Sequence, residues 1–548
     1  MIPSQKKWKI YWYLKKNKLI IYCTFFFGAL FLSLLNSHML YQKEDGWYSG
    51  GSTWADLAVH LSIISSFSER GINTLTDNPV YAGSKLNYPF VMDLISAIFY
   101  KIGFSIQSSL IIPALTMLLI LVILIFKLTY KITKSKTASF FVPFLFFLNG
   151  SLFGIYYFWQ DKIKSGLPLL DFLNQMQIEY AHLGDYNIRF SNIIADYILP
   201  QRAIILGLLV GIVVVYFFWE YWEGKKQISL IKAGLFTVTL PLIHTHTFIT
   251  MAFLSGFLFL IDLFLERDRK IFLNWLSYFA IVFLLGIPQL LLISPEQKSN
   301  FIKFYIGWMR EKNESLIWFW TKNLFPHIFI FLAGFMVAGK KLKSFYFAFF
   351  AVFILTNIII FQPHNYDNMK IMLYWFLLSC ILVGVFFESL FKKFSKKSYL
   401  IITPLFILLT LTGFLSVYRE SYVSWQMFSK EDIVFASFIK NNTQKNALFL
   451  TSDQHNGAIS SLSGRKILMG YRGWLWTYGI DYSEREGDIY DIYKGNDLSK
   501  SLISKYKIDY ILIEELKKNQ YAINSDFFEK NYKAKYRSKN YVLYKISR

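Results

Sequence analysis

The chain has 548 residues, of which 54% are hydrophobic and 19% aromatic, and its mean hydropathy is +0.35. This composition is too apolar for a soluble protein of this length and indicates a polytopic membrane protein. The formal net charge of +22 is interpreted as a topology signal plus a basic tail, and no nucleic-acid partner is expected. The chain contains no Gly-rich phosphate loop and no HExxH, CxxC or GxSxG motif, which excludes the usual nucleotide, zinc-protease and serine-hydrolase sites.

Long apolar segments recur along the chain. Each is roughly 16 to 22 residues long, which is the length that a helix needs to cross a bilayer core. The first is expected to remain as an anchor rather than to be cleaved as a signal peptide, and 229–245 and 323–338 are short enough to be broken or tilted. We predict a mainly α, helical membrane protein of about eleven spans, namely 19–40, 106–126, 137–157, 202–221, 229–245, 247–265, 271–293, 323–338, 344–361, 371–390 and 398–417.

The lysines are distributed unequally between the two sides of these spans. They are dense from Lys6 to Lys18 and in short links such as KLTYKITKSK and FKKFSKK, and sparse in the opposite links. The positive-inside rule therefore places the N-terminus in the cytoplasm and residues 419–548 outside it. We expect a multi-pass protein of the plasma (inner) membrane. The two cysteines, Cys23 and Cys380, lie inside predicted spans, so no disulfide framework is expected in the outer region.

The first outer loop, 41–105, carries polar residues that a membrane anchor does not need. Asp56 and His60 are four residues apart, so on a helix they share one face above an apolar stripe. An amphipathic helix lying on the membrane surface would hold this pair at the water interface. Asp56 is our candidate general base, with Asp45 as the next candidate, and Tyr88 is a candidate substrate contact.

Two cations stand at the starts of predicted helices on the outer side. Arg202 follows the second outer loop, 158–201, in LPQRA, and Lys370 ends the segment FQPHNYDNMK. A cation at a helix N-terminus opposes the helix dipole, which suits an anion captured between the two side chains. A snorkelling interfacial arginine is a nearly equal alternative. In the same segment as Lys370, Asp367 is a candidate partner for its ammonium, and His364 and Asp367 are candidate substrate contacts.

His244 and His246 lie at the outer end of the fifth predicted span, in PLIHTHTF. On a continuous helix, residues two apart point about 200° away from each other, which prevents joint chelation. They converge only if the helix breaks, as Pro241 permits. A metal site competes here with a pair of hydrogen-bonded interfacial histidines, which is the commoner arrangement.

The composition changes from about Lys430 onward. Short β-type runs alternate with helical stretches, which is the pattern of a small α/β domain. We therefore divide the chain into a transmembrane domain, 1–418, whose outer loops 41–105 and 158–201 are catalytic, and an extracytoplasmic α/β domain, 419–548. Aromatic residues crowd the segment GYRGWLW and suit stacking on carbohydrate, although a core role explains some of them equally well. The candidate substrate contacts in this segment are Tyr471, Arg472, Trp474 and Trp476.

A cytoplasmic tail, an outer loop with an acidic residue on a juxtamembrane helix, about eleven spans and an outer C-terminal domain together resemble the GT-C superfamily of integral-membrane glycosyltransferases. The first-loop acid of that family corresponds to Asp56 in TWADLAVHL, and its aromatic-proline step to Tyr88 and Pro89. Many members have paired acids there, whereas Leu57 follows Asp56 here, and His60 is the candidate helper. The segments LPQRA, HTH, QPHNYDNMK and GYRGWLW are similar to a prokaryotic branch of this superfamily.

The resemblance implies transfer of a sugar from a polyprenyl-phosphate carrier to an extracytoplasmic acceptor of the cell envelope, which is a glycan, a lipid or a protein. Asp56 would remove the acceptor proton, an assistance typically worth about 10² to 10⁴ in rate, and Arg202 and Lys370 would bind the donor phosphate. Since some members use a divalent metal ion, such an ion is a candidate cofactor. Its candidate ligands are Asp56, His60, His244 and His246. The expected partners are the polyprenyl-phosphate-linked sugar and membrane lipids.

Two other functions compete with this interpretation. A lipid or polysaccharide transporter or flippase would carry ionisable residues near the middle of its spans and an internal repeat. In this sequence the polar residues gather at one outer face and no repeat is visible. A non-catalytic sugar-binding membrane protein would need only the C-terminal domain, which leaves Asp56, Arg202 and Lys370 on three separate outer elements unexplained.

Overall fold

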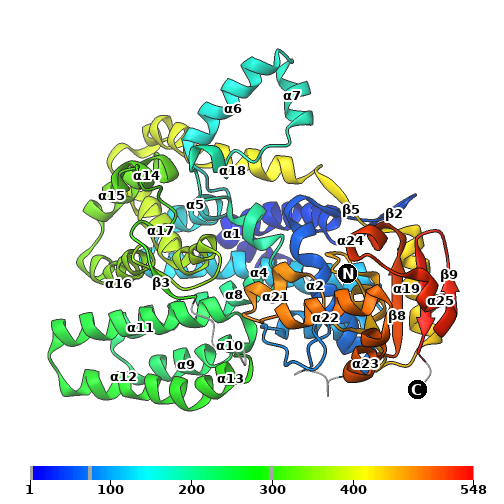
Figure 1. Ribbon diagram of the computed structural model, residues 1–548. Helices are drawn as coiled ribbons and strands as arrows, with labels where there is room; N and C mark the ends of the chain where they lie inside the picture. The colour runs from blue at the N-terminus through cyan, green and yellow to red at the C-terminus, as the bar shows by residue number, and fades with distance from the viewer. Residues whose placement is uncertain (1–3, 72–76, 295–300, 547–548) are drawn as a thin grey trace.

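The computed structural model describes residues 4–71, 77–294 and 301–546, with side chains from residue 17 onward. Helices make up most of the chain, and the longer strands lie in the first outer loop and near the C-terminus (Figure 1). The helices up to residue 420 are α1 (Ser4–His38), α2 (Trp54–Arg70), α3 (Val91–Lys101), α4 (Ile106–Thr133), α5 (Lys136–Phe147), α6 (Leu152–Ser165), α7 (Leu169–Gln175), α8 (Arg202–Gly224), α9 (Gln227–Thr237), α10 (Leu240–Ile243), α11 (Thr245–Glu266), α12 (Arg269–Ile281), α13 (Ile287–Leu292), α14 (Leu316–Leu324), α15 (His327–Val337), α16 (Lys340–Thr356), α17 (Met369–Phe394) and α18 (Tyr399–Glu420).

The structure does not confirm the predicted number of membrane-crossing helices. Among the described residues, six helical stretches are long and apolar enough to cross a membrane, and eight if two bent pairs each count as one span. The eleven predicted spans are therefore not confirmed as a count. The predicted span 229–245 is divided between α9 and α10, and 323–338 falls on α14 and α15, which meet at 91°. Both were the shortest segments, and a short apolar run does not reach across the bilayer core as one straight helix.

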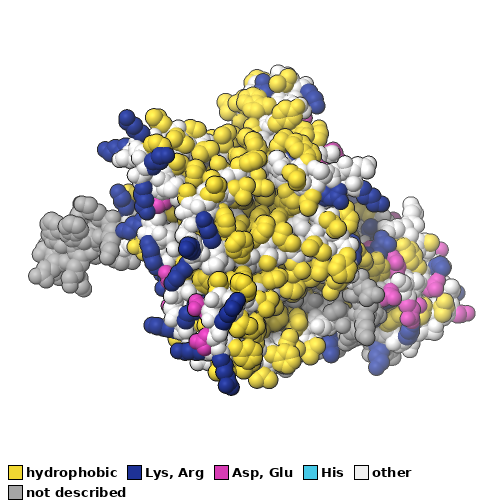
Figure 2. Space-filling model, turned by 90° about the vertical axis from the view of Figure 1, so that its left-hand side faces the viewer, with side chains coloured by type: hydrophobic (Ala, Val, Ile, Leu, Met, Phe, Trp, Pro, Cys, Tyr) yellow, Lys and Arg dark blue, Asp and Glu magenta, His cyan; other side chains and the backbone are white. Residues whose placement is uncertain are grey.

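The surface of the helical part is apolar. Figure 2 shows hydrophobic side chains across the middle of the molecule, Lys and Arg along the left rim, and mixed charges on the right. Phe25, Phe264 and Phe283 are 77%, 71% and 68% exposed, which suits contact with lipid and would be unfavourable in water. The chain is therefore a multi-pass membrane protein. The lysine-rich start, 6–16, lies outside the residues whose side chains the structure describes.

The last part of the chain forms the predicted α/β region. A five-stranded sheet has the order β7-β6-β8-β10-β9, in which β6 runs parallel to β7 and β8, and β10 runs antiparallel to β8 and β9. Its strands are β6 (Leu448–Leu450), β7 (Lys466–Ile467), β8 (Tyr510–Glu514), β9 (Lys533–Arg537) and β10 (Tyr541–Lys545). Its helices are α19 (Lys430–Asn442), α20 (Ala458–Ser463), α21 (Arg472–Thr477), α22 (Ser483–Lys494), α23 (Asp497–Tyr506), α24 (Lys518–Tyr521) and α25 (Ser525–Asn531).

The first outer loop pairs and packs with the C-terminal region. Strand β2 (Gly46–Gly50) pairs antiparallel with β1 (Tyr41–Lys43) on one side and with β5 (Ser424–Ser429) on the other. A shorter pair joins β3 (Lys303–Phe304) to β4 (Ile359–Ile360). Val80 and Tyr81 of the first loop are buried in the hydrophobic cores of the C-terminal region. The loop therefore contributes to the same folded body as residues 424–546.

The amphipathic pattern of α2 predicted a helix exposed to water along one face, but most of the helix is enclosed by protein. Its residues from Leu57 to Phe67 are all buried, because α20 and α3 pack against the helix. Ser62 donates a hydrogen bond to Ser460 at 3.1 Å, and Ser65 donates to the Ser461 carbonyl at 2.7 Å. Gly464 has φ +67° and passes so close that a Cβ there would meet the Ser65 carbonyl oxygen at 2.5 Å.

Candidate functional site

Asp56 lies in the first turn of α2 and is half-buried between that helix, the start of α17 and the C-terminal region. His60, Lys370 and His455 are near enough to stabilise its negative charge, and Asp367 is near enough to oppose it. Burial raises the pKa of the Asp56 carboxyl, and the positive neighbours offset this effect only in part. Within the described ranges no side chain forms a hydrogen bond or ion pair with its carboxylate. The carboxylate is therefore available to an incoming hydroxyl group.

His60 follows one helical turn after Asp56, as predicted, but it is 1% exposed. Its Nδ1 lies 2.8 Å from Oδ2 of Asp93 on α3, a carboxylate that sequence reasoning did not single out. Its Nε2 is buried and finds no hydrogen-bond partner among the described atoms. The aspartate thus holds the imidazole by one nitrogen, and Asp56 is close enough for the ring to act on its charge.

Arg202 does not sit at an open phosphate site. Its side chain is completely buried, with Nε 3.4 Å from Asp93 Oδ1, Nη2 donating to Ser96 at 2.5 Å and Nη1 donating to the Leu110 carbonyl at 3.3 Å. We expected the anion beside this cation to be a donor phosphate shared with Lys370, whereas in the described residues it is the Asp93 carboxylate. Arg202 therefore connects α3, α4 and α8. These contacts disfavour the predicted contact of its guanidinium with a donor phosphate.

Lys370 is the cation at the centre of the site. Its Nζ lies 3.0 Å from Asp367 Oδ1, the partner that the sequence predicted, and its side chain is 7% exposed. It is also near enough to Asp56 and His246 for electrostatic interaction with both. A buried ammonium with one carboxylate partner can accept a second anion. Lys370 therefore remains the candidate phosphate contact.

The helix breaks between the two histidines of HTH, as their convergence requires. Helix α10 ends at Ile243, His244 is extended with φ −163° and ψ 98°, and α11 begins at Thr245. The two imidazole rings lie 5.0 Å apart and nearly parallel. Each already has a polar partner, since His244 Nδ1 lies 2.9 Å from Thr247 Oγ1 and His246 Nε2 is hydrogen-bonded to Gln362. With the Lys370 ammonium close to both, this pair is a poor cation site.

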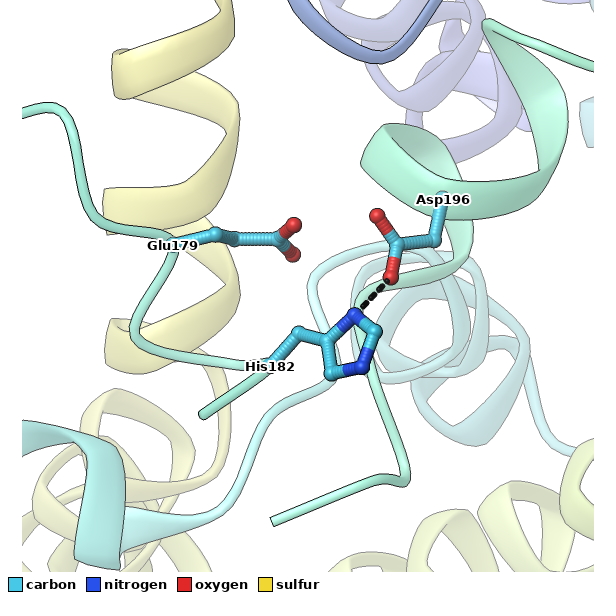
Figure 3. Close-up of side chains that lie close together, drawn as sticks. All are labelled: Glu179, His182 and Asp196. Atoms are coloured by element: carbon cyan, nitrogen blue, oxygen red, sulfur yellow. Dashed lines mark hydrogen bonds and ion pairs between the residues drawn. The ribbon is translucent and has the colours of Figure 1, made fainter. Parts of the chain in front are cut away.

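A different group has the donor atoms for a metal ion. Glu179, His182 and Asp196 come from the second outer loop, and one ligand atom of each lies within 4.8 Å of the others (Figure 3). Figure 3 shows the two carboxylates facing each other, with the imidazole beside them. His182 Nδ1 lies 2.9 Å from Asp196 Oδ2. Oxygen and imidazole nitrogen ligands in this combination suit divalent ions such as Mn²⁺ or Zn²⁺.

The two carboxyls of this group differ in proton affinity. Burial, the charge of Asp196 and a hydrogen bond to it hold the pKa of Glu179 well above its usual range. Burial also raises the pKa of Asp196, but hydrogen bonds from His182 and Tyr366 outweigh it and lower the value to about 2. Glu179 Oε1 is buried with no hydrogen-bond partner among the described atoms. A divalent cation that replaced the Glu179 proton would satisfy this oxygen, so the three residues fit a metal ion.

Tyr366 connects this group to Lys370. Its hydroxyl donates to Asp196 Oδ2 at 2.5 Å, and its ring stacks on the His182 imidazole at 4.9 Å. Tyr366 belongs to the 3₁₀ turn η6 (Asn365–Asn368), which also contains Asp367, the partner of Lys370. The Asp56 and Lys370 cluster and the Glu179 group are therefore neighbouring parts of one polar site.

Aromatic rings from the C-terminal region form a wall beside Asp56. The His455 imidazole stacks on Trp54 at 4.3 Å, and its Nε2–H donates a hydrogen bond to the Ala55 carbonyl at 2.6 Å. Trp476 meets the His364 ring edge-on at 4.9 Å, and these two predicted contacts are both exposed. The rings packed around His455 are Trp54, Tyr471 and Trp474. The predicted Tyr88 ring lies 5.8 Å from His60 and 5.2 Å from Tyr478.

Two other predicted residues, Asp45 and Arg472, already have polar partners within the protein. Asp45 is exposed in the turn between β1 and β2, where it accepts hydrogen bonds from Tyr48 at 2.7 Å and Gln426 at 3.3 Å, and it is not part of the Asp56 cluster. The Arg472 guanidinium pairs with Asp453 at 2.5 Å and Glu486 at 2.8 Å. Its predicted substrate contact would require it to leave both carboxylates.

No protein-family model matches the sequence, and no curated protein matches it. Solved structures do match. An oligosaccharyltransferase from Archaeoglobus fulgidus, tethered to an acceptor peptide, aligns with a TM-score of 0.56 and 11% identity over 98% of this chain and 75% of its own. A complex of that protein with Zn and sulfate aligns with a TM-score of 0.56 and 11% identity, over 96% of this chain and 73% of its own. ArnT from Cupriavidus metallidurans, bound to undecaprenyl phosphate, aligns with a TM-score of 0.55 and 9% identity, over 97% of this chain and 98% of its own. The chain has the GT-C fold.

The GT-C fold explains why polar residues far apart in the sequence meet on one side of the helices, but sequence spacing found only some of them. Asp93 lies 33 residues after His60, a separation that no periodic pattern marks. Glu179 and His182 form an E-x-x-H pattern in EYAH, which is a usable signal. Asp196 follows 14 residues after His182, inside an apolar stretch, and Tyr366 comes from a different loop.

Proposed function

We propose that this protein is a membrane glycosyltransferase that transfers a sugar from a polyprenyl-phosphate carrier to an acceptor on the side of the C-terminal region. The observation that carries the proposal is the juxtaposition, in a GT-C fold, of the half-buried Asp56 with the Lys370 ammonium and the Glu179, His182 and Asp196 group. The lysine-rich side of the helices would face the cytoplasm, and the site would open on the opposite side.

The proposed reaction is a direct displacement at the anomeric carbon. The acceptor oxygen forms the new bond to that carbon, its proton passes to the Asp56 carboxylate, and the bond from the carbon to the carrier phosphate oxygen breaks. Because burial raises the pKa of Asp56, its carboxylate is a stronger base than an exposed aspartate. His60, held by Asp93, lies one helical turn from Asp56 and would stabilise the negative charge of its carboxylate.

The leaving group is a polyprenyl phosphate, on which negative charge increases as the bond breaks. The Lys370 ammonium is placed to stabilise this charge through a charge-assisted hydrogen bond, which is roughly twice as strong as a neutral one. Glu179, His182 and Asp196 would hold a divalent ion, which supplies further positive charge to the phosphate when bound. The solved ArnT and oligosaccharyltransferase structures contain undecaprenyl phosphate and Zn respectively, which supports both assignments.

The acceptor would approach along the aromatic wall. Trp476 and Tyr471 are 43% and 36% exposed, enough to stack against an apolar sugar face. His364 meets Trp476 from η6, so this contact joins the wall to the segment that carries Lys370. We therefore propose that Tyr471, Trp476 and His364 contact the acceptor or the transferred sugar.

A transfer assay tests the proposal. Purified protein is incubated with undecaprenyl-phosphate-linked and dolichyl-phosphate-linked sugars together with envelope extracts as acceptors, and release of the free polyprenyl phosphate is measured. The wild-type protein should release it, and Asp56→Asn should not, because the amide keeps the shape of the side chain but cannot accept a proton. Asp45→Asn is the matched control, since it removes the same charge from an exposed turn and should leave release unchanged.

Two results would contradict the proposal. Normal release by Asp56→Asn would remove Asp56 from the mechanism. Movement of intact lipid-linked sugar across a vesicle membrane, with no release of polyprenyl phosphate from any donor, would favour a flippase instead.

A further inference from the structure

A groove of about 710 Å³ opens at the lysine-rich ends of α1, α4 and α8, away from the proposed catalytic site. Its polar lining includes Lys127 and Lys131 in the last turns of α4, Lys134 just after that helix, and Lys136 at the start of α5. Four lysines within ten residues of sequence therefore line one cavity. Lysines placed only to bias topology would have no reason to converge on a hollow.

The charge of the groove favours an anion. Its described lining contains four lysines and no acidic residue. The Glu223 carboxylate stands beside it, 3.7 Å from Lys131 Nζ and 3.4 Å from Lys134 Nζ. Lys134 remains 62% exposed despite this contact, so its ammonium can also reach a ligand. The Glu223 carboxylate pairs with two of these lysines and the described lining adds no acidic residue, so the lining carries more positive than negative charge.

The other wall of the groove is apolar and aromatic. Leu124 and Phe217 line it from α4 and α8, and Ile20 lines it from α1. Tyr216 on α8 contributes a ring 5.7 Å from Lys131 Nζ. All three helices are long enough to cross a membrane, so this wall lies where lipid acyl chains end. The ligand must therefore combine an anionic head with alkyl chains.

We propose that this groove binds an anionic phospholipid of the leaflet on the lysine-rich side, with its phosphate among Lys127, Lys131, Lys134 and Lys136 and an acyl chain against Leu124 and Phe217. Basic pockets between transmembrane helices are the usual sites for such head groups. A free phosphate would use the lysines but gain nothing from the apolar wall. The site would tie the protein to a membrane of a given composition and does not depend on the proposed transfer reaction.

Lipid binding to the full-length protein tests this inference. Protein in phosphatidylcholine nanodiscs is titrated with a fluorescent phosphatidylglycerol, and the apparent affinity is measured. The variant with Lys127, Lys131, Lys134 and Lys136 all changed to Gln should bind at least about tenfold more weakly, because it lacks the positive charge that attracts an anionic head group. Changing the same four to Arg keeps the charge and should keep the affinity within about threefold.

The matched control changes Lys392, Lys393, Lys396 and Lys397 to Gln, which removes the same charge from the last turn of α17 and the link that follows it. It should retain wild-type affinity. Equal losses in the two glutamine variants would show that only overall charge matters and would overturn the site, as would unchanged affinity in the groove variant. Inorganic phosphate at millimolar concentration should not displace the lipid, and full displacement would replace the lipid site by a phosphate site.

Discussion

The buried Arg202 gives a prediction whose size follows from the structure. In Arg202→Ala, Asp93 loses the cation beside it while remaining 1% exposed, and Ser96 and the Leu110 carbonyl lose a hydrogen-bond donor. Removing one partner of a buried ion pair typically costs about 3 to 5 kcal/mol. At roughly 2 °C for each kcal/mol, the value for large domains, the unfolding midpoint should fall by roughly 6 to 10 °C.

Thermal unfolding of the purified protein in detergent, followed by tryptophan fluorescence, measures this change. Arg269→Ala is the matched control, because Arg269 also opens a helix but is exposed, and its midpoint should shift by about 1 °C or less. The double variant Arg202→Met with Asp93→Leu removes both charges and should recover much of the lost stability, since apolar residues often replace a buried pair without cost.

The alternative role of Arg202 gives the opposite result. If its guanidinium contacted the donor phosphate, Arg202→Ala would unfold within about 1 °C of the wild type and would need more polyprenyl-phosphate sugar for half-maximal transfer. That pair of observations would refute the assignment of Arg202 to the buried contact between α3, α4 and α8.

Three further predictions concern the catalytic base, the metal group and the topology. Burial raises the pKa of Asp56, and this base acts only when it is deprotonated, so the transfer rate should decline at a pH above the pKa of an ordinary aspartate. A rate that declines only at or below the ordinary pKa would argue against Asp56 as the base. Burial and the charge of Asp196 raise the pKa of Glu179, so binding of Mn²⁺ should release protons and strengthen as pH rises. Glu179→Gln should weaken this binding by roughly tenfold or more and reduce the proton release, both measured by calorimetry in buffers of different ionisation enthalpy. A cysteine at Leu516, which is 86% exposed, should react with an impermeant thiol reagent in intact cells, whereas one at Lys397 should react only after permeabilisation; the reverse pattern would invert the topology.

The helical membrane architecture could be predicted because the bilayer imposes one length and one polarity on each span. The number of spans could not be predicted, because a bent pair such as α14 and α15 has the composition of one span and the geometry of two short helices. Composition also identified the α/β region, where strand and helix patterns alternate. The burial of α2 was missed because its polar face, which suggested water, is covered by serines and carbonyls of α20.

The site was predictable where the chemistry is local. Asp56 and His60 are one turn apart on a helix, and Asp367 and Lys370 are three residues apart, so spacing alone joined each pair. Asp93, which anchors His60, comes from another helix, and only tertiary packing brings it there. The same reason applies to the metal group, because Glu179 and His182 lie in an irregular part of the loop and Asp196 lies in the short helix η4 (Ile194–Ile198), too short for a periodic pattern.

A structure of the protein with a bound polyprenyl phosphate tests the central claim most directly. The phosphate should lie within hydrogen-bond distance of Lys370 Nζ, beside the Glu179, His182 and Asp196 group. The isoprenoid chain should extend between helices toward the lipid. Lys370→Met should weaken binding of the carrier. A phosphate bound elsewhere, with Lys370 still paired to Asp367 alone, would contradict this claim.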